Sequence, residues 1–271
     1  MKTSAVSPEK LVVECVLGAG AILRRRFGRR LEIKVKGPHA SIVTDADLAS
    51  EAWIIRRLRA RFPEHQIIAE ESGYARTGSE WTWVIDPLDG TSNFATGLPW
   101  FGVQIALLRK FKPVLAAIYL PLEEALYFAA RGQGCFRNGK RVRVSGQRRA
   151  QDILCAFALD GGAEERAMRQ QLRRLARLVN GVRNVRATNS LVDFCYTLEG
   201  RLGGCVNLNT KIWDIAPLAV MLPQAGGKLT DLEGRPILFL PEVEPVDRDY
   251  QVLGASRVLH PQLVGLINGA D

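Results

Sequence analysis

An apolar run that ends abruptly in two aspartates constrains this chain more than any other stretch. Residues 81–102 read WTWVIDPLDGTSNFATGLPWFG. The run Trp81–Ile85 predicts a buried strand, Pro87 predicts a turn directly after it, and Gly90 predicts the start of a helix. Strand, turn and helix start follow one another immediately, so both aspartates of the stretch are expected at one edge of a sheet.

The two aspartates, Asp86 and Asp89, are three residues apart, so both carboxylates can point at one spot. The carbonyl of Leu88 lies between them and can point there too. Oxygen ligands of this kind suit magnesium rather than zinc. Backbone N–H groups after Gly90 would face the same spot and favour a phosphate. An ordinary turn rich in Asp and Gly has the same composition, so the metal-site interpretation depends on further acids.

Two distant parts of the chain supply such acids. Glu70 and Glu71 follow the strand candidate Gln66–Ala69. They are either plain solvent-exposed acids or a contribution to the sheet edge that carries Asp86. Asp214 opens a late helical pattern, where an acid favours the helix dipole or else delivers a fourth carboxylate to the metal site.

Two helices are predicted ahead of this stretch. Ser7 followed by Pro8 is typical of a helix start, with a capping side chain and a proline at the first position. A second helix is predicted to begin at Thr44 or Asp45 and to end before Pro63. Its expected apolar stripe consists of Leu48, Ala52, Ile55, Leu58 and Phe62.

Short extended segments and helical patterns alternate through the rest of the chain. The strand candidates are 65–69, 81–85, 102–108, 114–119 and 125–130. The middle of the chain therefore predicts an antiparallel meander, and the sequence RNGK at 137–140 predicts a tight hairpin turn. Helical patterns return at 164–179, about 189–199 and about 213–224. We expect an α+β chain forming a single domain over residues 1–271, with subdomains of roughly 1–150 and 151–271.

Composition and charge narrow the class of protein. The 271 residues are 47% hydrophobic, enough for a substantial core, and no apolar run reaches the ~18 residues of a membrane span. Five cysteines without a CxxC pair indicate neither a disulfide framework nor a zinc site. The N-terminus lacks the apolar core of a signal peptide, so we expect a cytoplasmic protein.

The net charge of +9 is compatible with nucleic acid, an anionic membrane or a small anionic substrate. Arginines gather at 24–30 and at Arg166, Arg169, Arg173, Arg174 and Arg177. We interpret the second group as a solvated helix face, and we do not expect nucleic acid or a membrane as a partner.

Three motifs in order resemble the inositol monophosphatase family, within a larger group that includes fructose-1,6-bisphosphatases and nucleotide 3′-phosphatases. The motifs are Glu70-Glu71, DPLDGTSNF at 86–94 and WDIA at 213–216. The similarity extends to Lys36, Val43–Asp45, Asp47, residues 132–139 and Gly226–Gly227, and so covers nearly the whole chain. The resemblance implies a layered αβαβα fold, a homodimer, and a magnesium-dependent phosphatase that lithium inhibits.

The resemblance also implies the metal ligands. Glu70, Asp86 and the carbonyl of Leu88 would hold one magnesium ion. Asp86, Asp89 and Asp214 would hold a second, with Asp86 bridging the two. A third, weaker ion near Glu70 is a further option.

Water activation and phosphate binding are implied in the same way. Glu70 and Thr91 would orient the attacking water, and Asp47 would hydrogen-bond to Thr91. The backbone of Gly90 and Thr91 would cradle the phosphate, and Asp214 would also contact the substrate.

Two positions depart from the inositol-specific pattern. Members specific for inositol carry an acid seven residues before the last metal-binding aspartate, and that position is Asn207 here. Arg186–Asn189 replaces the usual Gly-Thr or Gly-Ser. Asn207 is interpreted as a ligand for a hydroxyl or amide. Arg186 is either a partner for a second anionic group or a surface residue.

We therefore expect hydrolysis of a small-molecule phosphate monoester, with an inositol-phosphate-like substrate first. Histidinol phosphate, a sugar phosphate and a 3′-phosphonucleotide are the alternative substrates. A basic regulatory or RNA-associated protein on the same scaffold is the alternative of another class. A non-catalytic protein on this scaffold would not need the four acids and the threonine together. The presence of all five, Glu70, Asp86, Asp89, Thr91 and Asp214, favours the enzyme over the regulatory protein.

Overall fold

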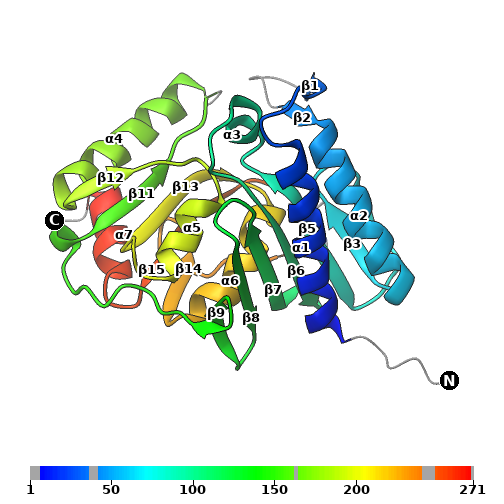
Figure 1. Ribbon diagram of the computed structural model, residues 1–271. Coiled ribbons are helices and arrows are strands. Elements are labelled where there is room, and N and C mark those ends of the chain that lie inside the picture. The colour runs from blue at the N-terminus through cyan, green and yellow to red at the C-terminus, as the bar shows by residue number, and fades with distance from the viewer. Residues whose placement is uncertain (1–6, 37–41, 162–163, 240–247, 270–271) are drawn as a thin grey trace.

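The helices and strands stack in alternating layers, helix, sheet, helix, sheet, helix (Figure 1), which confirms the predicted αβαβα order. The computed structural model describes residues 7–36, 42–161, 164–239 and 248–269. The helices are α1 Pro8–Arg26, α2 Asp45–Arg61, α3 Thr91–Thr96, α4 Glu165–Gly181, α5 Leu191–Leu198, α6 Ile212–Gln224 and α7 His260–Asn268. Within these ranges no helix is both long and apolar enough to cross a membrane.

The first large sheet has the strand order β10-β9-β8-β7-β6-β5-β3-β4 and is antiparallel except for the pair β3 and β5. Its strands are β3 Gln66–Ala69, β4 Gly73–Ala75, β5 Trp81–Asp89, β6 Gly102–Arg109, β7 Lys112–Leu120, β8 Ala125–Ala130, β9 Gly134–Arg137 and β10 Lys140–Arg141. The predicted meander and the RNGK hairpin are both confirmed. The turn works because Asn138 and Gly139 both adopt positive φ, 48° and 75°.

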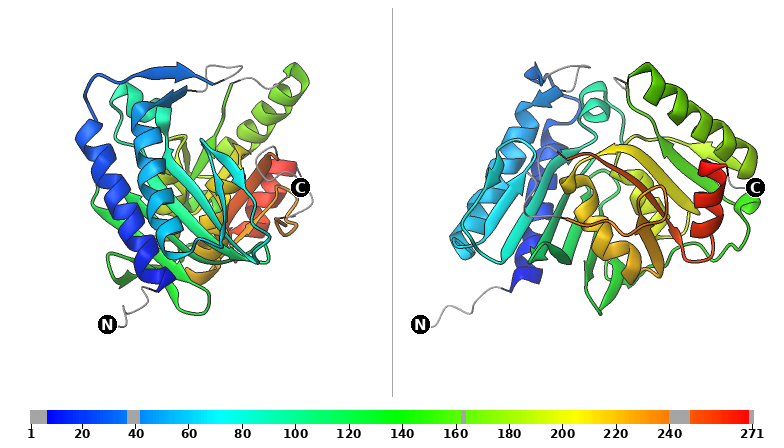
Figure 2. Two further views of the ribbon diagram at one scale, coloured as in Figure 1. Left: turned by 90° about the vertical axis from the view of Figure 1, so that its right-hand side faces the viewer. Right: turned by 180° about the vertical axis from the view of Figure 1, so that it is seen from behind.

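The second large sheet has the order β12-β11-β13-β15-β14. Its strands are β12 Asn184–Arg186, β11 Leu154–Ala158, β13 Gly204–Thr210, β15 Tyr250–Ser256 and β14 Gly227–Thr230. A small ribbon pairs β1 Ile33–Val35 with β2 Ile42–Thr44. Figure 2 shows α1 and α2 on one outer side of the molecule, and α4 with α7 on the opposite side.

The core follows this layering because successive residues of a strand face opposite ways. On β5, Trp83 and Ile85 pack in the cluster with α1 and α2. Val84 between them packs in the cluster that contains α5 and α6. That inner cluster also takes residues from the second sheet, so α5 and α6 are held between the two sheets. A third cluster joins the second sheet to α4 and α7.

Helix α2 begins and ends as predicted, with Thr44 as its cap, but its predicted apolar stripe is only partly right: Leu58 is buried, whereas two members are exposed. Leu48 is 47% exposed and Ala52 is exposed. The buried side of the helix instead carries Asp47, Ser50 and Glu51 with Ile54 and Leu58. Polar residues on a buried face break the apolar periodicity, and all three bond to segments that form the site described below.

Helix α4 presents most of its arginines to solvent, as expected, with one exception. Arg174 is buried, and its guanidinium lies 3.3 Å from the side-chain oxygen of Gln251 and 3.5 Å from that of Glu233. The interpretation of Arg174 as part of the solvated face is therefore wrong, because the helix turns this side chain toward the second sheet.

Candidate active site

A polar cavity of about 330 Å³ opens between the two large sheets. Among its lining residues are Glu70, Asp86, Leu88, Asp89, Gly90, Thr91, Asn207 and Asp214, all of them singled out from the sequence. It is also lined by Asp160, Asn189, Ser190 and Asn209, which the sequence analysis did not single out as site residues. Segments that are far apart in the chain thus converge on one cavity.

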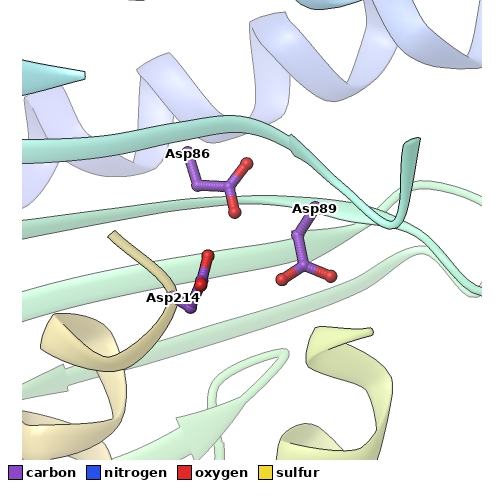
Figure 3. A group of neighbouring side chains, drawn as sticks. All are labelled: Asp86, Asp89 and Asp214. Carbon is purple, nitrogen blue, oxygen red and sulfur yellow. The ribbon is translucent and has the colours of Figure 1, made fainter. Parts of the chain in front are cut away.

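Three carboxylates form a close group in this cavity. One oxygen from each of Asp86, Asp89 and Asp214 lies within 4.8 Å of the other two. Figure 3 shows Asp86 and Asp89 on the same strand, with the carboxylate of Asp214 approaching from the start of α6. These oxygen atoms can hold a hard cation such as magnesium together.

An irregularity in the sheet brings Asp86 and Asp89 to the same side. The pairing of β5 with β6 shifts register between these two residues, so that Asp86 lies opposite Gln104 and Asp89 opposite Gly102. Three steps along β5 therefore match two steps along β6. Such a bulge redirects side chains that a regular strand would send to opposite faces.

Backbone N–H groups hold each of the three carboxylates. Asp89 accepts a hydrogen bond of 2.6 Å from the N–H of Leu191 at the start of α5. Asp214 accepts one of 2.6 Å from the N–H of Lys211, which caps α6. Asp86 accepts one of 3.1 Å from the N–H two residues further on. The backbone therefore helps to fix all three carboxylates.

Gln104 is a site residue that the sequence analysis missed. Its side chain is completely buried, and its amide nitrogen lies 3.2 Å from an oxygen of Asp86 and 3.2 Å from an oxygen of Asp89. Its amide oxygen has no hydrogen-bond partner among the described residues. The available signal was a lone glutamine inside the apolar strand GVQIALL.

Burial raises the pKa of every acid in this group. Desolvation is the largest cause for Asp86 and Asp214, with repulsion from neighbouring carboxylates adding to it, and both pKa values lie well above the ordinary value. Desolvation also raises the pKa of Glu70 and of Asp89 to about 7. Carboxylates in such surroundings need cations to stay ionised. The donor set is all oxygen, so it fits magnesium.

Glu70 lines the same cavity but stands apart from the close group of three. The ammonium of Lys36 lies 3.2 Å from a Glu70 carboxylate oxygen and also bonds to Glu71. The N–H of Glu71 donates to the carboxylate of Glu51 at 2.9 Å. The Glu-Glu pair is thus tied to α2 and to the strand β1 that ends beside Lys36.

Thr91 and Asp47 are in direct contact. The hydroxyl of Thr91 lies 3.0 Å from a carboxylate oxygen of Asp47 and 2.9 Å from the carbonyl of Leu88. The other oxygen of Asp47 accepts hydrogen bonds from the N–H (2.8 Å) and hydroxyl (2.6 Å) of Thr44. Gly90 occupies the cap position of α3, and no side chain caps that helix. The Thr91 hydroxyl therefore serves contacts with other segments rather than its own helix.

Gly90 fits where no other residue would. Its φ is 83°, and an added Cβ would lie 2.5 Å from the carbonyl oxygen of Trp100. The next turn of α3 is fixed by Asn93, whose amide donates to the carbonyls of Trp100 (2.9 Å) and Thr188 (2.8 Å). Asn93 therefore joins the two sides of the cavity.

The two predicted substrate-binding residues Asn207 and Arg186 lie in different places relative to the cavity. Asn207 lines the cavity, and its side-chain oxygen accepts a hydrogen bond of 3.1 Å from the N–H of Asn209. Arg186 is exposed and is not among the lining residues. Its guanidinium donates to the carbonyl of Val185 at 2.8 Å. Its side chain thus lies at the surface in this structure, and its role in binding an anion stays a prediction.

Comparison with known proteins agrees with this geometry. The model of the inositol monophosphatase family matches residues 8–269. Nus factor SuhB of Haemophilus influenzae is 34% identical over 227 residues, covering 82% of this chain and 84% of that protein. Inositol-1-monophosphatase of Mesorhizobium japonicum is 34% identical over 229 residues, covering 83% and 85%. The crystal structure of extragenic suppressor protein suhB from Bartonella henselae is similar with a TM-score of 0.86 and 30% identity, over 96% of this chain and 98% of that chain.

Proposed function

Since this chain belongs to the inositol monophosphatase family, we propose that it hydrolyses a small-molecule phosphate monoester with the help of magnesium. The close group of Asp86, Asp89 and Asp214 is the observation that carries the proposal. These acids share a cavity with the glycine-led start of α3. A cation site beside a helix start suits a phosphate dianion.

We carry the ligands of the metal ions over from the family resemblance. We assign one magnesium ion to Glu70, Asp86 and the carbonyl of Leu88, and a second to Asp86, Asp89 and Asp214. A third, weaker site near Glu70 completes the assignment. Bound magnesium would supply an activated water at neutral pH and would neutralise charge on the phosphate and the leaving oxygen.

The chain's own groups would orient the water and the phosphate. Asp47 can accept a hydrogen bond from the Thr91 hydroxyl. The lone pairs of the Thr91 oxygen are then free to accept a hydrogen bond from water. Glu70 lines the same cavity and would hold that water from another direction. The backbone N–H groups of Gly90 and Thr91 would bind phosphate oxygens at the start of α3.

An inositol-phosphate-like substrate is supported by the relative named inositol-1-monophosphatase. Asn207 and Asn209 in the cavity provide neutral groups for substrate hydroxyls. Histidinol phosphate, sugar phosphates and 3′-phosphonucleotides stay as alternatives. A homodimer in the cytoplasm, and inhibition by lithium, are further predictions. Light scattering at micromolar protein concentration checks the dimer.

A second candidate function has its own support. A relative with 34% identity bears the name Nus factor SuhB, and this chain carries a net charge of +9. Arg166, Arg169 and Arg173 are exposed along α4. A regulatory or RNA-associated role would use this outer surface and would not need the acids of the cavity.

One experiment separates the two candidates. Phosphate release is measured from a panel of phosphomonoesters with millimolar magnesium and again with a chelator, for the wild type and for Asp89→Asn. We expect release that requires magnesium and is lost in the variant. If folded wild-type protein releases no phosphate from any ester with magnesium, the hydrolase proposal is refuted and the regulatory candidate gains.

A further inference from the structure

The cavity holds one carboxylate that the proposed hydrolysis does not use. Asp160 follows β11 and is partly buried at the side of the cavity built by the second sheet. The metal-binding acids come from β3, β5 and α6, whereas Asp160 shares its side with Asn189, Asn207 and Asn209. It lies near enough to Asp89 to contribute to that residue's raised pKa.

Asp160 has a neutral partner and no cationic one. The amide of Asn189 donates to one of its carboxylate oxygens at 2.9 Å and to the carbonyl of Leu159 at 3.0 Å. Within the described residues, no Lys or Arg forms an ion pair with Asp160. None of the residues described as lining the cavity is a Lys or Arg either. A partly buried carboxylate without a counter-charge is costly for the free protein.

This arrangement determines which leaving groups the cavity favours. A substrate with a second phosphate would bring like charge to Asp160 and would meet no cation on that side. A neutral polyol could bond to the three asparagines without any need for a charge. A protonated amine would supply the missing counter-charge and donate a charge-assisted hydrogen bond.

We infer that Asp160 selects phosphate monoesters whose alcohol portion carries a protonated amine. The inference rests on the proposed function, because the metal-binding acids must hold the phosphate end of the same molecule. It names the chemical class of the substrate as amino-alcohol phosphates. Asn189 acts as a positioning residue that fixes one oxygen of Asp160.

A matched substrate series tests this inference. Alkyl phosphates of increasing chain length are compared in pairs that end in either an amine or a hydroxyl, with magnesium at neutral pH. At the best chain length, the wild type should prefer the amine about 10- to 100-fold in kcat/KM, the range expected for a hydrogen bond between charged groups. The preference should weaken as salt is added.

Asp160→Asn removes the charge but keeps an oxygen that Asn189 can donate to. We expect this variant to lose the amine preference, so that its ratio of kcat/KM between the amine and hydroxyl series falls toward one. Asp152→Asn is the matched control, because Asp152 is half exposed, lies outside this cavity and pairs with Arg149. The control should keep the full preference.

Binding gives a second measurement that does not depend on turnover. Calorimetry with non-hydrolysable ω-aminoalkyl phosphonates and magnesium should show tighter binding to the wild type than to Asp160→Asn. Hydrolysis of both series without an amine preference would refute the role of Asp160 and leave the hydrolase proposal intact. No hydrolysis of either series, together with no hydrolysis of the phosphomonoester panel, would refute the hydrolase proposal, and equal phosphonate binding by both proteins would refute the inference.

Discussion

The two sides of the cavity are built on different physical principles. The acid side consists of Glu70, Asp86, Asp89 and Asp214, and the amide side consists of Asn189, Asn207 and Asn209 with Asp160. On the acid side, Asp86 is 1% exposed and Asp86, Asp89 and Asp214 are each held by a backbone N–H. On the amide side, Asn189 and Asn209 are exposed; the side chain of Asn189 bonds to the loop after β11, and the N–H of Asn209 bonds to Asn207 on the same strand.

The difference shows which side can change without loss of the chemistry. Clustered like charges are stable only around cations at set positions, so the acid side tolerates little displacement. Amides bind many polar groups at modest cost, so the amide side can be altered to suit another leaving group. We therefore expect substitutions on the acid side to change turnover and those on the amide side to change substrate preference.

The sharpest test compares one residue from each side. Asp89→Asn should lower kcat by about 10³-fold or more, because it removes a charge that we propose holds the second metal ion. Asn207→Ala should instead raise KM by up to about tenfold with little change in kcat. Steady-state kinetics at millimolar magnesium measure both. Near wild-type turnover in Asp89→Asn would contradict the metal assignment.

Thr91 tests whether the acid side also prepares the water. Thr91→Ala should cut turnover by at least about 100-fold while fold and magnesium affinity stay largely intact, because the hydroxyl fixed by Asp47 is lost. Thr91→Ser keeps that hydroxyl and should recover most of the activity. A variant that loses thermal stability but keeps its turnover per folded molecule would assign Thr91 a purely structural role.

Gln104 tests how far the acid side extends beyond the acids themselves. Gln104→Leu removes the amide that contacts both Asp86 and Asp89. The affinity for magnesium, measured by calorimetry, should fall about 10- to 100-fold, as is typical when a group that orients metal ligands is removed. Gln104→Asn shortens the side chain but keeps the amide, so its magnesium affinity is expected to lie between those of the wild type and Gln104→Leu. If Gln104→Leu binds magnesium with unchanged affinity, Gln104 contributes only to packing.

The smallest effect concerns stability without metal. The raised pKa values mean that the folded chain favours the protonated acids, with Glu70 and Asp89 at about 7. The protonated acids therefore contribute their full stabilisation to the folded, metal-free protein below the ordinary pKa near 4. This contribution is lost as the pH rises through 7. The melting temperature of chelator-treated protein should fall over this window, and magnesium should restore it most at the alkaline end. Asp89→Asn should flatten the metal-free profile, and an unaltered slope would speak against the charge cluster as its cause.

Local signals predicted the acid side well and the amide side poorly. The strand and the helix start around DPLDG could be inferred from neighbours in sequence, but the predicted turn at Pro87 is wrong, because β5 continues to Asp89 and accommodates this stretch as a bulge. Asp214 reaches the site only because α6 packs between the sheets, and its role was inferred from a family resemblance. Asp160 had no local signal at all, because its place depends on how the second sheet meets the first.

The sequence was misleading where function overrides apolar patterning. On α2 the buried face carries Asp47, Ser50 and Glu51, so the search for an apolar stripe selected Leu48, which is exposed. Gln104 was overlooked because one polar residue in a strand normally marks a solvent face. For Arg186 the sequence left two interpretations open, because its place in the chain does not reveal the direction of its side chain, which is exposed and donates to the carbonyl of Val185.

The amide of Asn93 has a consequence for how such a molecule can diversify over evolutionary time. It donates hydrogen bonds to the backbone carbonyls of Trp100 and Thr188, and a backbone carbonyl is present whatever amino acid occupies the position. Mutations at residue 188 can therefore change the chemistry of the loop without loosening its anchor. Because this anchor does not depend on the side chain at residue 188, the loop can acquire new side chains during evolution while its backbone stays held in place.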